Sequence, residues 1–125
     1  MNNSYALGRI AEDRAAEYIR SIGMDVIDRN VRNDYGELDI TAFDVTAHPK
    51  ELVIIEVRCR TLGKMQSPLE SIGSRKIRTL MRASQQYVDD MNWPGFWRID
   101  AVGITADKKK APDEWELEHV RDITA

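Results

Sequence analysis

The sequence predicts an α/β fold, in which a mixed central sheet is flanked by helices and the element order is α-β-β-β-α-β-β. Two observations predict it. Apolar residues recur at helical spacing in two segments, and five other segments are short, apolar or alternating, and bounded by turn residues. The 125 residues suffice for one hydrophobic core and are too few for two, so we expect a single domain over residues 1–125.

The helical pattern occurs twice. Residues 4–22 place Leu7, Ala11 and Ile19 on one face, and Gly23 favours the end of this helix. Residues 71–91 predict a second, amphipathic helix with an apolar face and a basic face. The basic face carries Arg75, Arg78 and Arg82.

Strands are expected at residues 24–32, 36–44, 51–59, 96–105 and 115–123, the last of them at an edge of the sheet. The loop 45–50 has the length and the proline content of a hairpin connection. We therefore expect the second and third strands to pair as an antiparallel hairpin, with Asp44 opposite Glu51.

Composition excludes several classes of protein. No apolar stretch approaches the roughly 18 residues of a membrane span, and the N-terminus lacks the pattern of a secretory signal, so we expect a cytoplasmic protein. One cysteine, Cys59, and two isolated histidines exclude a disulfide framework and a zinc site. The net charge is −3, yet residues 58–82 alone carry +6, which favours a local surface for a polyanion such as nucleic acid.

The third predicted strand changes character at Glu56. In "LVIIEVRCR", residues 52–60, the odd positions stay apolar, whereas the even positions pass from leucine and isoleucine to Glu56, Arg58 and Arg60. One face of the strand therefore stays in the core while the other becomes charged. Because an apolar neighbourhood penalises an unpaired charge, this end of the strand is a candidate active site.

The hairpin register places two carboxylates opposite each other. With Asp44 paired to Glu51, Asp39 lies opposite Glu56. Directly opposed carboxylates repel, whereas a divalent hard cation between them turns the repulsion into coordination. The register thus predicts a metal site.

The same register makes two further predictions. Leu38 shares an apolar face with Val57, and Glu37 meets Arg58. A two-residue slip would keep the faces and change the partners. The alternative interpretation is that these acids and arginines pair with one another on the solvated side of a two-stranded ribbon.

Glu12 is a lone acid on a small and apolar face of the first helix. Its neighbours on that face are Gly8, Ala15, Ala16 and Ile19. It lies about two turns into the helix, where the favourable effect of the helix dipole on an acid has faded. A core-facing carboxylate needs a partner. If this face packs on the sheet, Glu12 can point at Asp39 and Glu56 as a third acid.

Five stretches in order carry a resemblance over nearly the whole chain: "LGRIAEDRAAEYI", "RNVRNDYGELDI", "IIEVRCR", "SRKIRTLMRASQQYV" and "WRIDAVGI". Together they resemble the YraN-like family of uncharacterised bacterial proteins. That family is placed in the PD-(D/E)XK nuclease-like superfamily, near the archaeal Holliday-junction resolvases. The resemblance implies a restriction-endonuclease-like αβββαβ core, here with an extra C-terminal strand.

The resemblance also implies a site. Asp39 would match the acid of the P-D dipeptide and Glu56-Val57-Arg58 the (D/E)-X-K tripeptide, so that Asp39 and Glu56 hold Mg²⁺ (or Mn²⁺) and Glu12 completes the site. The backbone phosphates would be held by Arg60, Arg75, Arg78 and Arg82.

One residue departs from the family pattern. Its usual lysine is Arg58 here, and an arginine cannot act as a general base, although it can clamp a phosphate or stabilise developing charge. Lys76 on the following helix could supply an ammonium group instead. Arg98 and Asp100, which match the R-x-D of the family, favour a structural ion pair over direct chemistry.

Two functions remain open on the sequence. The first is a metal-dependent endonuclease that acts on structured or branched DNA, or on RNA, as the three acids beside a basic helix suggest. The second is a non-catalytic nucleic-acid-binding or accessory protein that keeps the nuclease fold, as Arg58 suggests. A protein-interaction module is a weaker third. A homodimer is expected only by analogy with resolvases.

Overall fold

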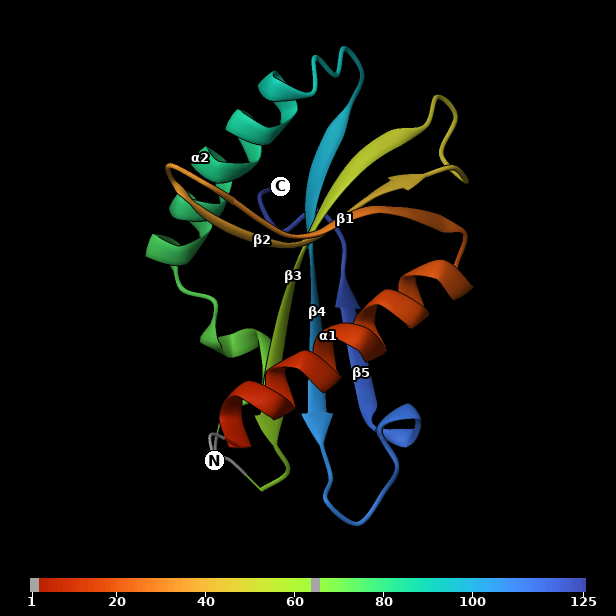
Figure 1. Ribbon diagram of the computed structural model, residues 1–125, viewed down its shortest axis with the longest axis vertical. Coiled ribbons are helices and arrows are strands. Elements are labelled where there is room, and N and C mark those ends of the chain that lie inside the picture. The colour runs from red at the N-terminus through yellow and green to blue at the C-terminus, as the bar shows by residue number, and fades with distance from the viewer. Residues whose placement is uncertain (1–2, 64–65) are drawn as a thin grey trace.

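A five-stranded sheet with the order β1-β2-β3-β4-β5 organises the computed structural model, which describes residues 3–63 and 66–125 (Figure 1). The strands are β1 (Met24–Asn33), β2 (Gly36–Asp44), β3 (Glu51–Thr61), β4 (Trp97–Ala106) and β5 (Glu116–Val120). Neighbours are antiparallel except β3 and β4, which run parallel. This confirms the predicted mixed sheet with an extra C-terminal strand, β5, at its edge.

Two helices complete the predicted α-β-β-β-α-β-β order. They are α1 (Asn3–Ser21) and α2 (Ser74–Asp90), accompanied by the short 3₁₀ helices η1 (Leu69–Ser71) and η2 (Pro112–Glu114). Gly23 adopts a positive φ of 96° just after α1, the conformation that ends many helices. The second helix starts later than expected because η1 forms a separate turn before it. In the described ranges, neither helix has the length and apolar character needed to cross a lipid bilayer.

The core has two parts, one on each face of the sheet. Ala11, Ala15, Ala16 and Ile19 of α1 pack on one face, where Figure 1 shows the helix crossing the strands. Leu80, Ala83, Tyr87 and Val88 of α2 pack on the other face. Strand β3 contributes Val53 and Ile55 to the first part and Leu52 and Ile54 to the second. It is apolar on both faces because it lies between two helices.

The β2–β3 hairpin has the predicted register over the loop-proximal half of β2. Asp44 lies opposite Glu51, and Ile40 lies opposite Ile55. The prediction for the rest of β2 is wrong. Leu38 packs in the core part under α2, whereas Val57 packs in the part under α1, so the two do not share a face.

The predicted contact between Glu37 and Arg58 is also wrong. Glu37 lies opposite Arg32 of β1, and the Arg32 Nη2 to Glu37 Oε2 distance is 3.1 Å. The reason is that β1 stays paired with β2 up to the turn at residues 34–35, whereas the β2–β3 register ends at Ile40. The first residues of β2 therefore pair with β1 and not with β3.

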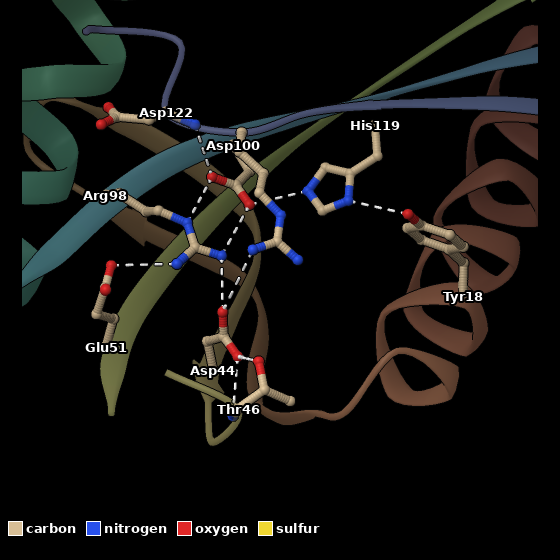
Figure 2. Close-up of polar contacts among 9 residues, drawn as sticks. Tyr18, Asp44, Thr46, Glu51, Arg98, Asp100, His119 and Asp122 are labelled. Carbon is tan, nitrogen blue, oxygen red and sulfur yellow. Dashed lines mark hydrogen bonds and ion pairs between the residues drawn. The ribbon is translucent and has the colours of Figure 1, made fainter. Parts of the chain in front are cut away.

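A buried ion-pair network joins three strands far from that turn (Figure 2). The Arg98 side chain is only 10% exposed, and its guanidinium lies 2.9 Å from Asp100, 3.0 Å from Asp44 and 3.1 Å from Glu51. These acids come from β4, the end of β2 and the start of β3. The predicted Arg98–Asp100 ion pair is thus confirmed.

The same network reaches α1 and the C-terminal segment through Asp100. Its carboxylate accepts a hydrogen bond from the Asp122 backbone N–H and shares one with His119, whose other ring nitrogen lies 3.0 Å from the Tyr18 hydroxyl (Figure 2). Burial works to raise the pKa of Asp100, but the hydrogen bonds with His119 and Arg98 outweigh it and hold the pKa below its usual range. The cluster is electrostatically satisfied, as a structural network should be.

Arg98→Ala should lower the free energy of unfolding by about 3–5 kcal/mol, because it leaves buried carboxylates without their cation. Urea unfolding at pH 7 measures the loss. Arg121→Ala is the matched control, since Arg121 is exposed and lies 4.0 Å from the same Asp44 carboxylate. It should cost no more than about 0.5 kcal/mol. Equal, small losses in the two variants would show that the network does not stabilise the fold.

Candidate active site

The candidate site begins where β2 and β3 separate. Their register ends at Ile40 and Ile55, while β3 continues beside β4 as far as Thr61 and Ala106. At the separation, the Val57 backbone N–H donates to Asp39 Oδ2 at 2.8 Å. A side-chain carboxylate thus takes the place of a strand carbonyl, and from Val57 to Thr61 the residues of β3 line a cavity.

The cavity has a volume of about 710 Å³ and is named the Asp39 cavity below. Its walls come from the N-terminal half of α1, from β2 and β3, and from residues 66 and 71 after β3. The lining includes Gly8, Glu12, Asp39, Arg58, Arg60 and Ser71. Four of the sequence-predicted site residues therefore line one space.

Glu56 is the most buried acid of the site, with a side chain that is 4% exposed. Burial, followed by the charge of Asp39 and a hydrogen bond with it, raises the pKa of Glu56 to about 8. Two cations oppose the shift through the same oxygen: Arg58 Nη2 lies 3.4 Å and Lys76 Nζ 3.5 Å from Glu56 Oε2. Despite them, burial and the neighbouring Asp39 keep the pKa of Glu56 raised, and a divalent cation bound between the two carboxyl groups would oppose that shift.

Glu12 lies near this pair on α1. Its Oε1 atom is buried and has no hydrogen-bond partner among the residues that the structure describes, although Arg29 Nη2 lies 3.6 Å away. Burial and then the charge of Asp39 raise the pKa of Glu12. The structure thus confirms that Glu12 packs toward Asp39. Within residues 3–63 and 66–125, however, no three acidic, histidine or cysteine side chains converge closely enough to enclose a metal ion.

The basic helix contributes one residue to this site. Lys76 turns inward to Glu56, whereas Arg75, Arg78 and Arg82 are exposed on α2. The three arginines do not line the Asp39 cavity, and Arg82 lines a different one beside Tyr35. Helical periodicity separates them, because α2 presents Lys76 and the arginines on different sides. Arg98 and Asp100 belong to the buried network of Figure 2 and do not line the Asp39 cavity either.

A second cavity of about 550 Å³ lies against the other side of Glu12 and is named the Arg29 cavity. It shares Gly8 and Glu12 with the Asp39 cavity. Its basic residues include Arg29 and Arg32 of β1. Sequence reasoning missed them. The only available signal was the polar run "DRN" at residues 28–30, which breaks the alternation expected of a strand.

Comparison with known proteins gives a family match. Residues 11–104 match the model of the Uncharacterised protein family UPF0102. A UPF0102 protein of Streptomyces griseus is 37% identical over 126 residues, which cover 99% of this chain and 100% of that protein. Another, of Syntrophotalea carbinolica, is 36% identical over 115 residues, or 91% of this chain and 87% of that protein. A third, of Marinobacter nauticus, is 39% identical over 103 residues, or 82% and 80%.

The raised pKa of Glu56 makes stability depend on pH. Between its ordinary pKa of 4.5 and about 8, the folded protein holds a proton that the unfolded chain releases. The free energy of unfolding should therefore fall as the pH rises through this window. Glu56→Gln removes the ionisation, so between pH 5 and 8 its stability should gain roughly 2–4 kcal/mol relative to the wild type.

Urea unfolding in EDTA at pH 5, 6.5 and 8 measures this difference. The control is Glu70→Gln, which changes the same group at an exposed position on η1. Its stability relative to the wild type should not vary with pH. A constant difference between Glu56→Gln and the wild type at all three pH values would contradict the raised pKa.

Proposed function

Since the chain belongs to the UPF0102 family of uncharacterised bacterial proteins, the YraN-like family that its motifs resemble, we propose its function from the site: a metal-dependent endonuclease that hydrolyses phosphodiester bonds of structured or branched DNA. One observation carries the proposal. Asp39 and Glu56 form a carboxyl pair at the open edge of β3, beside a cavity large enough for a nucleotide and next to two cations. Perturbed carboxyl groups of this kind cluster at functional sites.

The acids fit a hard divalent cation. Carboxylate oxygens are the ligands that Mg²⁺ and Mn²⁺ prefer, and both the buried Asp39–Glu56 pair and Glu12 Oε1, which has Arg29 at 3.6 Å but no hydrogen bond among the described residues, would gain from added positive charge. Asp39 and Glu56 would hold the ion, and Glu12 would become the third acid of the site by turning its side chain toward them, since the three do not converge among the described residues. A bound ion of this kind lowers the pKa of a coordinated water and neutralises charge on the reacting phosphate.

Arg58 and Lys76 supply fixed positive charge beside the acids. Arginine stays protonated at any physiological pH, so Arg58 binds and polarises the phosphate and leaves proton removal to other groups. Lys76 offers a second charge from α2, 3.5 Å from Glu56. Charges placed where the transition state becomes more negative accelerate phosphoryl chemistry.

The remaining basic residues support an extended substrate. Arg60 lines the Asp39 cavity, and Arg75 and Arg78 are exposed in the first turns of α2, on either side of Lys76 in the sequence. A substrate that only fills the Asp39 cavity would reach Arg60 but not Arg75 or Arg78. A duplex or branched DNA that continues past the start of α2 would reach Arg75 and Arg78. These arginines would then add salt-dependent contacts with its phosphates.

A second candidate function is non-catalytic nucleic-acid binding. The observation that favours it is that Glu56 already has two cationic neighbours, one of them Arg58 in place of the usual lysine. In such a protein the two cations would substitute for the metal. Asp39→Ala would then bind DNA as tightly as the wild type or more tightly, because it removes a negative charge from the binding surface.

Metal dependence distinguishes the two functions. Mg²⁺ and Mn²⁺ are titrated into the wild type and Asp39→Ala by calorimetry, and cleavage of labelled single-stranded, duplex and four-way-junction DNA is followed in parallel, with RNA of the same sequence as a further substrate. We expect the variant to lose metal binding and at least ~10²-fold in cleavage rate. Glu118→Ala, at an exposed acid on β5, is the control and should cleave normally. DNA binding without metal uptake or cleavage by the wild type would support the second function.

Substitutions of Arg58 test the role of its charge. Arg58→Lys keeps the charge and should keep the cleavage rate within about 10-fold, whereas Arg58→Met removes it and should lose ~10²-fold or more. Steady-state cleavage in Mg²⁺ at pH 7.5 measures both rates. A methionine variant that cleaves as fast as the wild type would rule out a role for Arg58 in the reaction.

A further inference from the structure

Gly8 occupies an unusual position in α1. It lies in the interior of a 19-residue helix, where glycine is destabilising relative to alanine. Close packing does not require it: among the residues that the structure describes, no heavy atom of another element lies within 4 Å of a Cβ built on Gly8. The missing side chain therefore leaves open space outside the helix. Glycine at such a position is typical of a close approach between the backbone and a ligand.

Gly8 belongs to the walls of two cavities. Gly8 and Glu12 line both the Asp39 cavity and the Arg29 cavity, which have volumes of about 710 and 550 Å³. The two cavities thus lie on either side of the same short part of α1. A side chain on Gly8 would project between them.

The Arg29 cavity has the chemistry of a phosphate site. Arg29 Nη2 lies 2.8 Å from Asp13, and Arg32 Nη2 lies 3.1 Å from Glu37. In the described part of the chain both guanidinium groups bond through Nη2 alone, which leaves most of their five N–H donors available. Exposed ion pairs of this kind are weak, so a phosphate can share or displace the carboxylates.

Asn30 of β1 also lines the Arg29 cavity and has an unusual backbone conformation. Asn30 adopts a positive φ of 54° within β1, although the β1–β2 register continues unchanged from the pair Arg29–Ile40 to the pair Val31–Leu38. Consecutive strand residues normally point to opposite faces, yet Arg29 and Asn30 both line the Arg29 cavity. Asn30 lies between these two pairs, in the strand that neighbours the β2 segment with Asp39.

We propose that the sugar–phosphate backbone of the bound DNA strand crosses α1 at Gly8, so that Arg29, Asn30 and Arg32 hold a phosphate that flanks the one hydrolysed at Asp39 and Glu56. This inference rests on the proposed nuclease function. It adds a second phosphate subsite and a path for the strand, with Gly8 at the point of closest approach. Arg29, Asn30 and Arg32 are positioning residues, because they hold the substrate away from the reacting atoms.

Blocking the path at Gly8 tests the inference. Gly8→Leu introduces a good helix former, so it should not lower the unfolding midpoint, but its side chain fills the crossing. We expect the variant to bind a fluorescently labelled single-stranded DNA at least ~10-fold more weakly, as measured by anisotropy in EDTA. Cleavage in Mg²⁺ at sub-saturating DNA should slow by the same factor. Ala6→Leu is the matched control on an exposed side of the same turn and should bind and cleave normally.

The arginine subsite is tested by the salt dependence of binding. Arg32→Ala should reduce the slope of log affinity against log salt by about 1, the value for one lost phosphate contact. Arg20→Ala, at an exposed arginine in the last turn of α1, should leave the slope unchanged. If Gly8→Leu fails to fold, this slope decides, and an unchanged slope in Arg32→Ala overturns the inference.

The remaining outcomes separate the inference from the function beneath it. If the wild type cleaves DNA and a folded Gly8→Leu variant binds and cleaves it normally, the proposed strand path is overturned and the nuclease function stands. A wild type that neither binds nor cleaves DNA in any condition overturns both.

Discussion

The hydrogen bond from the Val57 backbone N–H to Asp39 Oδ2 is the interaction on which the site depends. A backbone N–H that loses its strand partner inside a protein needs another acceptor. Because the Asp39 carboxylate supplies it, the part of β2 that precedes Ile40 can separate from β3 without leaving this donor unsatisfied. The edge of β3 then faces a cavity instead of a strand, and Glu56 is held buried next to a second carboxylate.

Two groups of buried acids in this fold differ in their electrostatics. Around Arg98, hydrogen bonds hold the pKa of Asp44 and Asp100 below their usual range in spite of burial, so these acids are fully compensated. Around Glu56, burial and the neighbouring Asp39 raise the pKa although two cations lie close. The first group joins strands, α1 and the C-terminal segment. In the second group the pKa stays raised, and groups with perturbed pKa values of this kind cluster at functional sites.

Helix α1 serves both the core and the site. Its alanines, Ala11, Ala15 and Ala16, are completely buried and let the helix lie close to the sheet, which brings Glu12 toward Asp39. One turn earlier, Gly8 leaves the helix surface bare between two cavities. The small residues of α1 therefore have two separate effects. The alanines allow close packing on the sheet, and Gly8 leaves open space beside the Asp39 and Arg29 cavities.

The sequence by itself determined the element order and the register of the β2–β3 hairpin near its loop, because periodicity, loop length and turn residues are local signals. It also identified Asp39, Glu56 and Glu12 as neighbours. Only the tertiary structure decided that Leu38 leaves the face of Val57, that Glu37 pairs with Arg32, and that three arginines of α2 point away from the Asp39 cavity. The first two depend on whether the start of β2 pairs with β1 or with β3. The third depends on how α2 is rotated about its axis against the sheet. Both are settled by competition between contacts distant in sequence, which no local pattern records.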